Sequence, residues 1–91
     1  DIMLTFNDVS KAEKYLKYAK VRLMEAIVMA EKGKYSYVNE LLRDFVTDLH
    51  EVAVLVKMTN PSDSEKIASM VVNETAVYLS MLDNLSKIVP K

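Results

Sequence analysis

Apolar residues recur along the chain at alternating spacings of three and four residues, in three separate stretches. The first stretch carries them at Val9, Ala12, Leu16, Ala19, Leu23, Ala26 and Ala30. The second carries them at Tyr35, Val38, Leu42, Phe45, Leu49, Val52 and Val56, and the third, with one threonine, at Ala68, Val71, Thr75, Tyr78, Leu82, Leu85 and Val89. Because this spacing puts all members of a set on one side of an α-helix, the pattern predicts three amphipathic helices, at about 8–32, 35–58 and 61–89.

Residues typical of helix ends stand at the boundaries of these stretches. Asn7 can cap the first helix, and Gly33, the single glycine, can take the left-handed conformation that follows a helix end. Two starts fit the third helix, one with Asn60 before a proline and the other with Ser62 and a glutamate three residues on as a capping box. Both connections are short, so successive helices run antiparallel. The sequence therefore predicts an all-α fold, an up-down-up antiparallel three-helix bundle that forms one domain over residues 1–91.

The composition is typical of a small helical domain, and the net charge and apolar runs limit the kinds of partner that we expect. Hydrophobic residues make up 51% of the chain, and one Gly with two Pro is too few for a turn-rich β fold. The net charge of −1 supplies no general attraction for nucleic acid. The longest apolar run, Val52–Val56, is far shorter than the roughly 20 residues that span a bilayer, so we expect no membrane insertion by this segment. The chain opens at Asp1 without an initiator methionine, and we expect a longer polypeptide with an export signal or anchor upstream.

Side chains that carry chemistry are scarce. The chain has no Cys and a single histidine, His50, which lies outside the apolar side of its helix. No serine stands in a nucleophile-elbow setting and no glycine-rich phosphate loop is present. We therefore predict that the protein is not an enzyme, and we expect no catalytic residue, cofactor or metal site.

Charged residues near the apolar sides suggest one structural contact. Four carboxylates, Glu40, Asp44, Asp48 and Glu51, line one side of the second helix, most simply as a solvated flank or as partners for basic groups. Arg22 and Glu74 each lie at the margin of the predicted core, where a charge is costly unless it is paired. We predict an ion pair between Arg22 and a carboxylate of a neighbouring helix, with Glu74 as the first choice and the carboxylate stripe as the second.

Two apolar rows lie outside the predicted core. Val21, Met24 and Val28 point away from the apolar side of the first helix. On the third helix the apolar arc is wider than a three-helix bundle needs, because it also includes Val72, Ala76 and Leu79. Rows of this kind mark association sites, so we predict a protein partner or self-association through them. Asn73 and Asn84 also stand in glycosylation sequons, although both fall inside a helix rather than in a loop.

Several segments together resemble the helical family catalogued as domain of unknown function 5667. The resemblance is carried by 4–7, by 11–16 with Ala19, Arg22, Leu23, Glu25 and Ala26, by 30–35, and by Val72, 74–76, Leu79, Met81, Leu82 and 88–90. The resemblance rests on the order of these segments and on the Gly-Lys turn at 33–34 more than on any single motif. The chain departs from the family pattern at Tyr78, where the family commonly has His, and at Val9, where it commonly has Pro.

The resemblance implies an extracytoplasmic helical module with no catalytic activity, because members of that family usually sit outside the cytoplasmic membrane. We therefore expect a structural or interaction module of a cell-envelope or secreted protein. A small-ligand or metal-sensing helical bundle is the alternative, and it would need a polar pocket that the apolar pattern does not indicate.

Overall fold

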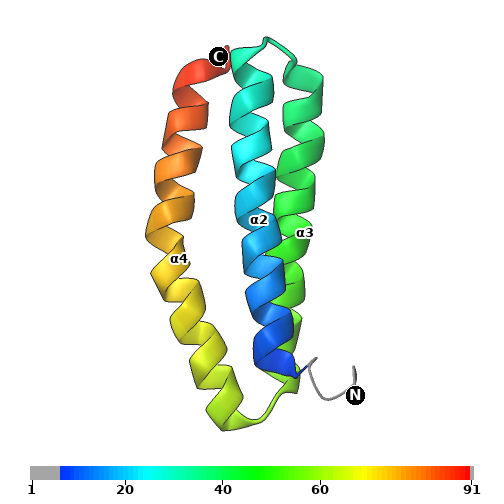
Figure 1. Cartoon of the computed structure of the whole chain (residues 1–91), viewed down its shortest axis with the longest axis vertical. Coiled ribbons are helices and arrows are strands. Elements are labelled where there is room, and N and C mark those ends of the chain that lie inside the picture. The colour runs from blue at the N-terminus through cyan, green and yellow to red at the C-terminus, as the bar shows by residue number, and fades with distance from the viewer. Residues whose placement is uncertain (1–6, 91) are drawn as a thin grey trace.

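The computed structural model describes residues 7–90, and the predictions that fall on residues 1–6 and on Lys91 lie outside this range. The described residues form three helices: α2 (Asp8–Glu31), α3 (Tyr35–Met58) and α4 (Pro61–Ile88). Successive helices run antiparallel, with α2 between α3 and α4 in the view of Figure 1. The predicted up-down-up three-helix bundle is confirmed, and each helix boundary lies within one residue of the predicted one.

Local chemistry fixes the helix ends. The Asn7 side chain accepts a hydrogen bond from the Ser10 amide, as its position before the helix predicts. At the other end of α2, Gly33 has φ of +73°, and the Lys34 amide donates to the Met29 carbonyl at 2.9 Å. This is the Schellman arrangement, which satisfies carbonyls that a helix end leaves free and which favours glycine at the left-handed position.

The start of α4 decides between the two predicted caps in favour of Asn60. Its side chain accepts the Asp63 amide at 2.9 Å, and its Nδ2 donates back to the Asp63 carboxylate at 3.0 Å. Pro61 occupies the first helical position, where a missing N–H costs nothing. The Ser64 hydroxyl also donates to the Val56 carbonyl, which ties the beginning of α4 to the last turns of α3.

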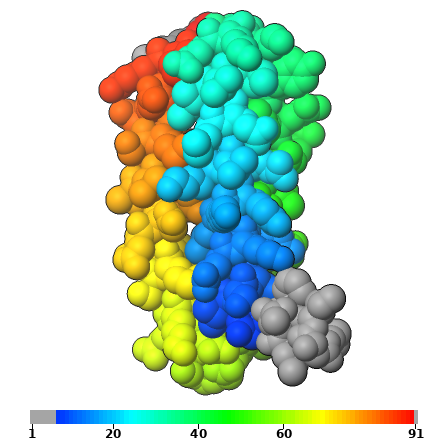
Figure 2. All heavy atoms as spheres, in the orientation of Figure 1, coloured from blue at the N-terminus to red at the C-terminus, as the bar shows by residue number. Residues whose placement is uncertain are grey.

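Helix α2 is the centre of the core. Four of its buried positions are alanines, namely Ala12, Ala19, Ala26 and Ala30. Small side chains on one side of α2 let the flanking helices approach closely, while Leu16 and Leu23 fill the remaining space. Helices α3 and α4 each pack extensively on α2 but contact each other much less. The face shown in Figure 2 accordingly presents α2 along its middle, between α4 and α3.

The predicted core positions of α4 need a correction. Ala68 and Thr75 are exposed, whereas Ile67, which the pattern left out, is completely buried. The true inward side runs through Ile67, the partly buried Glu74, Tyr78 and Leu85. Apolar residues lie on both sides of this line, so their spacing alone does not locate it. Ile67 is buried in preference to Ala68 because the larger side chain removes more apolar surface from water.

Candidate functional site

The outward apolar row of α2 is exposed as its register predicts. The exposed fractions are 42% for Val21, 53% for Met24 and 43% for Val28. Together with Glu25 and Met29 they line a shallow hollow of about 300 Å³ on the surface. Val21, Met24 and Val28 contribute to no core cluster of the described residues, so their exposure is not explained by packing within this chain. Whether they contact a partner stays a prediction.

The predicted row of α4 lies at the edge of a second apolar surface, between α3 and α4. Val72 is 71% exposed, Leu79 is 61% exposed, and Ala76 is also exposed. Val72 borders a hollow of about 530 Å³ whose other walls include Leu49, Ala53 and Val56 of α3, and Ala68 and Val71 of α4. One residue of the row, Val72, is therefore part of a groove to which two helices contribute.

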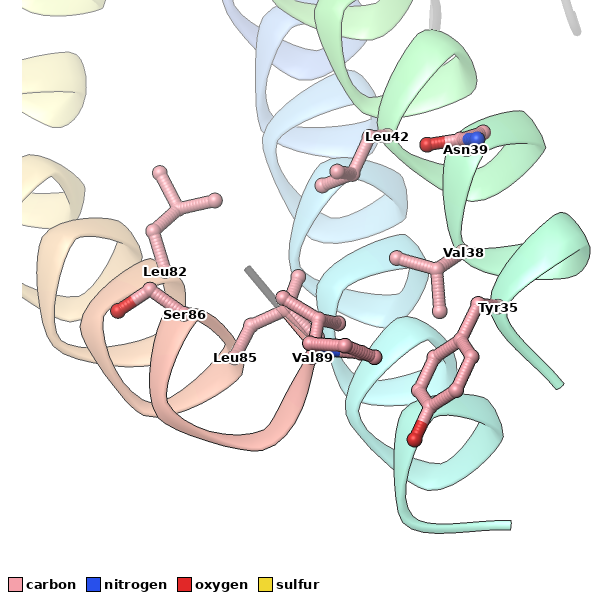
Figure 3. Close-up of a pocket in the computed structure, with 9 residues that line it drawn as sticks. Tyr35, Val38, Asn39, Leu42, Leu82, Leu85, Ser86 and Val89 are labelled. Atoms are coloured by element: carbon pink, nitrogen blue, oxygen red, sulfur yellow. The ribbon is translucent and has the colours of Figure 1, made fainter. Parts of the chain in front are cut away.

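A second hollow lies between the same two helices at the opposite end of the bundle. It has a volume of about 460 Å³ and is shown in Figure 3, where Val38 and Leu42 of α3 face Leu82, Leu85 and Val89 of α4. Tyr35, which the pattern counted among the core positions, is 40% exposed and lines this hollow. Sequence reasoning missed the groove, because it treated every in-pattern apolar residue of α3 and α4 as buried and did not predict that the two helices would pack so loosely.

Arg22 makes its ion pair with the second of the two expected partners. Its Nε lies 3.8 Å from Oδ2 of Asp48, a member of the carboxylate stripe, and not against Glu74. Both atoms are buried, and neither makes a hydrogen bond among the described residues. Burial raises the pKa of Asp48, the guanidinium of Arg22 opposes this, and the neighbouring Asp44 and Glu51 carboxylates reinforce it. The structure therefore brings Arg22 to α3, and it leaves Glu74 on the inward side of α4.

Tyr78 forms a contact that the sequence did not predict. Its hydroxyl donates a hydrogen bond of 2.7 Å to the Leu16 carbonyl, 62 residues away, in the middle of the core. Its ring meets Phe45 edge to face, with centroids 5.3 Å apart. Burial, with smaller contributions from Glu74 and Asp48, raises the pKa of Tyr78 to about 12. The side chain that departs from the family pattern therefore links all three helices.

Polar chemistry is sparse on the described surface. Within residues 7–90, no group of three or more His, Asp or Glu side chains is arranged to hold a metal ion. The most polar hollow, about 370 Å³ between α2 and α4, is lined by Lys17, Lys20 and Glu74 among others. His50 is exposed, as are Asn73 and Asn84 of the two sequons. In the same range, no helix has the length and apolar character that crossing a membrane requires.

Comparison with known proteins gives a family and no relative of established function. No curated protein and no solved structure matches the chain. The family described as Domain of unknown function (DUF5667) matches residues 1–91, which is the whole chain, and so confirms the resemblance seen in the sequence. The protein belongs to the family of domain of unknown function 5667.

Proposed function

We propose that the protein is a non-catalytic interaction module of a cell-envelope or secreted protein, which presents apolar helix faces to a protein partner. The observation that carries the proposal is the outward row of Val21, Met24 and Val28. Three neighbouring apolar side chains that are each about half exposed lower the solubility of a protein unless a partner covers them. The extracytoplasmic location is supported by the resemblance, since members of the family usually sit outside the cytoplasmic membrane.

The row is tested by photo-crosslinking in the host cell, with the full-length protein carrying a photoreactive residue at position 24. We expect a discrete crosslinked adduct. The matched control carries the same residue in place of Glu40, which is exposed on a polar part of α3, and should give none. The double variant Val21→Glu with Val28→Glu should abolish the adduct but lower the melting midpoint by only a few degrees, because both side chains are exposed.

Two further measurements separate this proposal from the ligand-sensing alternative. A thermal-shift screen of divalent metals and small metabolites should be flat, since any ligand that binds the folded chain raises its melting midpoint. Protease accessibility in intact cells should place the domain outside the cytoplasmic membrane. A midpoint raised by several degrees by one compound would favour a sensor, and complete protection from added protease would contradict the envelope location.

A further inference from the structure

The open side of the bundle between α3 and α4 carries an ordered pattern of charged and apolar side chains. On α3, four of the exposed positions on this side are Arg43, Val46, Ala53 and Lys57, at spacings of three, seven and four, and Asn39 and His50 are exposed on the same side. Ala53 and Lys57 line the hollow beside α4, and Val46 is one heptad before Ala53, so the four residues lie along one strip of the helix. Val46 is 61% exposed. The α3 strip is therefore basic at both ends, and between them it carries Val46 and Ala53 with His50 at its edge.

The facing strip of α4 has the same layout with the opposite charge. Four of its exposed positions are Glu65, Val72, Leu79 and Asp83, at spacings of seven, seven and four, and the exposed Ala68 and Ser86 line the two hollows on the same side. Val72 borders the hollow, and the other three share its side of the helix. Asp83 already pairs with Lys87 at 3.2 Å, but both side chains are more than half exposed, which leaves Asp83 accessible. The α4 strip is apolar in its middle and acidic at both ends.

The two hollows fix how the strips are aligned along the bundle. One places Val38 and Leu42 level with Leu82 and Leu85, and the other places Val52 and Val56 level with Ala68 and Val71. Helices α3 and α4 are antiparallel, so Arg43 lies at the level of Asp83, and Lys57 lies at the level of Glu65. Each basic end of the α3 strip thus stands at the same level as an acidic end of the α4 strip.

We propose that this α3–α4 face is a self-association surface, on which a second copy of the chain docks about a two-fold axis parallel to the helices. The inference deepens the proposed interaction function, and it uses a different face from the α2 row. In this arrangement α3 of each copy lies over α4 of the other at the same level. Val46 then meets Leu79 of the second copy, and Arg43 meets Asp83.

Charge selects this orientation over its alternative. A two-fold axis perpendicular to the helices would put α3 over α3 and α4 over α4 with the levels reversed. Arg43 would then face Lys57, and Glu65 would face Asp83, so every close charged pair would be repulsive. The parallel axis makes the same pairs attractive. A second copy of this face is therefore complementary in charge as well as in apolar character.

The face is also large enough for a stable dimer. Helix α3 has 24 residues. At about 1.5 Å per residue and two helices wide, the strip measures roughly 700 Å² per copy, or about 1,400 Å² in the dimer. Specific interfaces bury about 1,200–2,000 Å² in total. Association would cover Val46, Val72 and Leu79, which the isolated bundle leaves among its most exposed apolar side chains.

Sedimentation equilibrium of the 91-residue chain, from about 1 to about 300 micromolar, tests the proposal by charge exchange. The wild-type chain should dimerise. Arg43→Glu and Asp83→Arg should each raise the dissociation constant about ten-fold, because each change makes two symmetry-related contacts repulsive. The double variant should recover the wild-type constant. Lys66→Glu, an equal change of charge on an exposed position of α4 away from the strip, is the matched control and should have no effect.

Crosslinking fixes the orientation, since the chain contains no other cysteine. When a Val46→Cys chain is mixed with a Leu79→Cys chain, the two chains should form a disulfide with each other. A disulfide between Val46→Cys and Ala53→Cys chains instead would show the perpendicular axis and overturn the proposal. A monomer at the highest concentration, or a double variant that fails to recover while its melting midpoint is unchanged, would also overturn it. If Val21→Glu with Val28→Glu dissociates the dimer while Arg43→Glu leaves it intact, self-association occurs through the α2 row instead. The proposed function would then still stand.

Discussion

Among the described residues, each of the two interfaces that α2 makes contains a buried polar contact, and these two contacts differ in quality. Between α2 and α4, the Tyr78 hydroxyl donates to the Leu16 carbonyl at 2.7 Å. Between α2 and α3, the Arg22 Nε and the Asp48 Oδ2 are 3.8 Å apart, and neither atom makes a hydrogen bond among the described residues. The first pair is neutral and satisfied, while the second is charged and leaves polar atoms without close partners.

The difference has a physical cause. A neutral hydroxyl loses little when it leaves water for a carbonyl at ideal distance, whereas a carboxylate pays a larger desolvation cost that a distant guanidinium does not fully offset. The raised pKa of Asp48 reports this imbalance. The Tyr78 hydroxyl reaches the Leu16 carbonyl only when α4 stands at one height on α2, so this contact also fixes the register of the more loosely packed helix. The α2–α3 interface is the more extensive of the two and tolerates the poorer polar contact.

Replacing Tyr78 tests the first half of this comparison and should have the largest effect. Tyr78→Ala removes a buried ring and should lower the free energy of unfolding by about 3–5 kcal/mol. Tyr78→Phe removes only the hydroxyl and should cost about 1 kcal/mol, because the Leu16 carbonyl keeps its place in α2. Urea unfolding measures both changes, with Tyr37→Phe on the exposed surface as the control. If Tyr78→Phe leaves the free energy of unfolding unchanged, the hydrogen bond contributes no stability.

Much of the fold could be predicted from the sequence, because the decisive signals were local. The apolar spacing, the Asn7 cap and the single glycine at the first turn each act within a few residues of where they stand. On α4 the signal was ambiguous, since apolar residues flank the inward line on both sides. The choice of Ile67 over Ala68 depends on volume and on the reach of Tyr78, which are properties of the packed bundle.

The surfaces were only partly predictable for a similar reason. A helical wheel shows that Val21, Met24 and Val28 face away from the core, and it places Arg22 at the core margin. It does not say which flanking helix lies on the Arg22 side of α2, and this decides between Asp48 and Glu74. It also gives no spacing between α3 and α4, so the groove that includes Ala53 and Val72 could not be predicted.

Raising the pH tests whether the Tyr78 hydroxyl is buried in the α2–α4 interface. The pKa of Tyr78 rises from 10.0 to about 12 on folding, chiefly through burial. Between these values the unfolded chain releases the proton while the folded chain keeps it, so stability falls as pH rises. The wild-type chain should lose about 2 kcal/mol more than Tyr78→Phe between about pH 9 and 12. Urea unfolding at each pH measures the gap between the two proteins, and a gap that stays constant would contradict the burial of the hydroxyl.

The smallest effect is expected at the Arg22–Asp48 contact, where Asp48→Asn removes the charge but keeps the shape. Since desolvation of the carboxylate outweighs its attraction to Arg22, the change should alter the free energy of unfolding at pH 7 by less than about 1 kcal/mol, in either direction.

The same variant should change the response to acid in a defined direction. The folded pKa of Asp48 lies above the ordinary value of 3.8, so between the two values the folded chain holds the proton that the unfolded chain has released. This carboxyl therefore adds stability as pH falls through its folded pKa, opposite to a carboxylate held by a strong ion pair. Relative to Asp48→Asn, the wild-type chain should gain stability on mild acidification, which urea unfolding at each pH measures. If Asp48→Asn instead costs several kcal/mol at pH 7, and the wild-type chain loses stability relative to it in acid, the ion pair stabilises the bundle. The two interfaces of α2 would then not differ in the way that their geometry indicates.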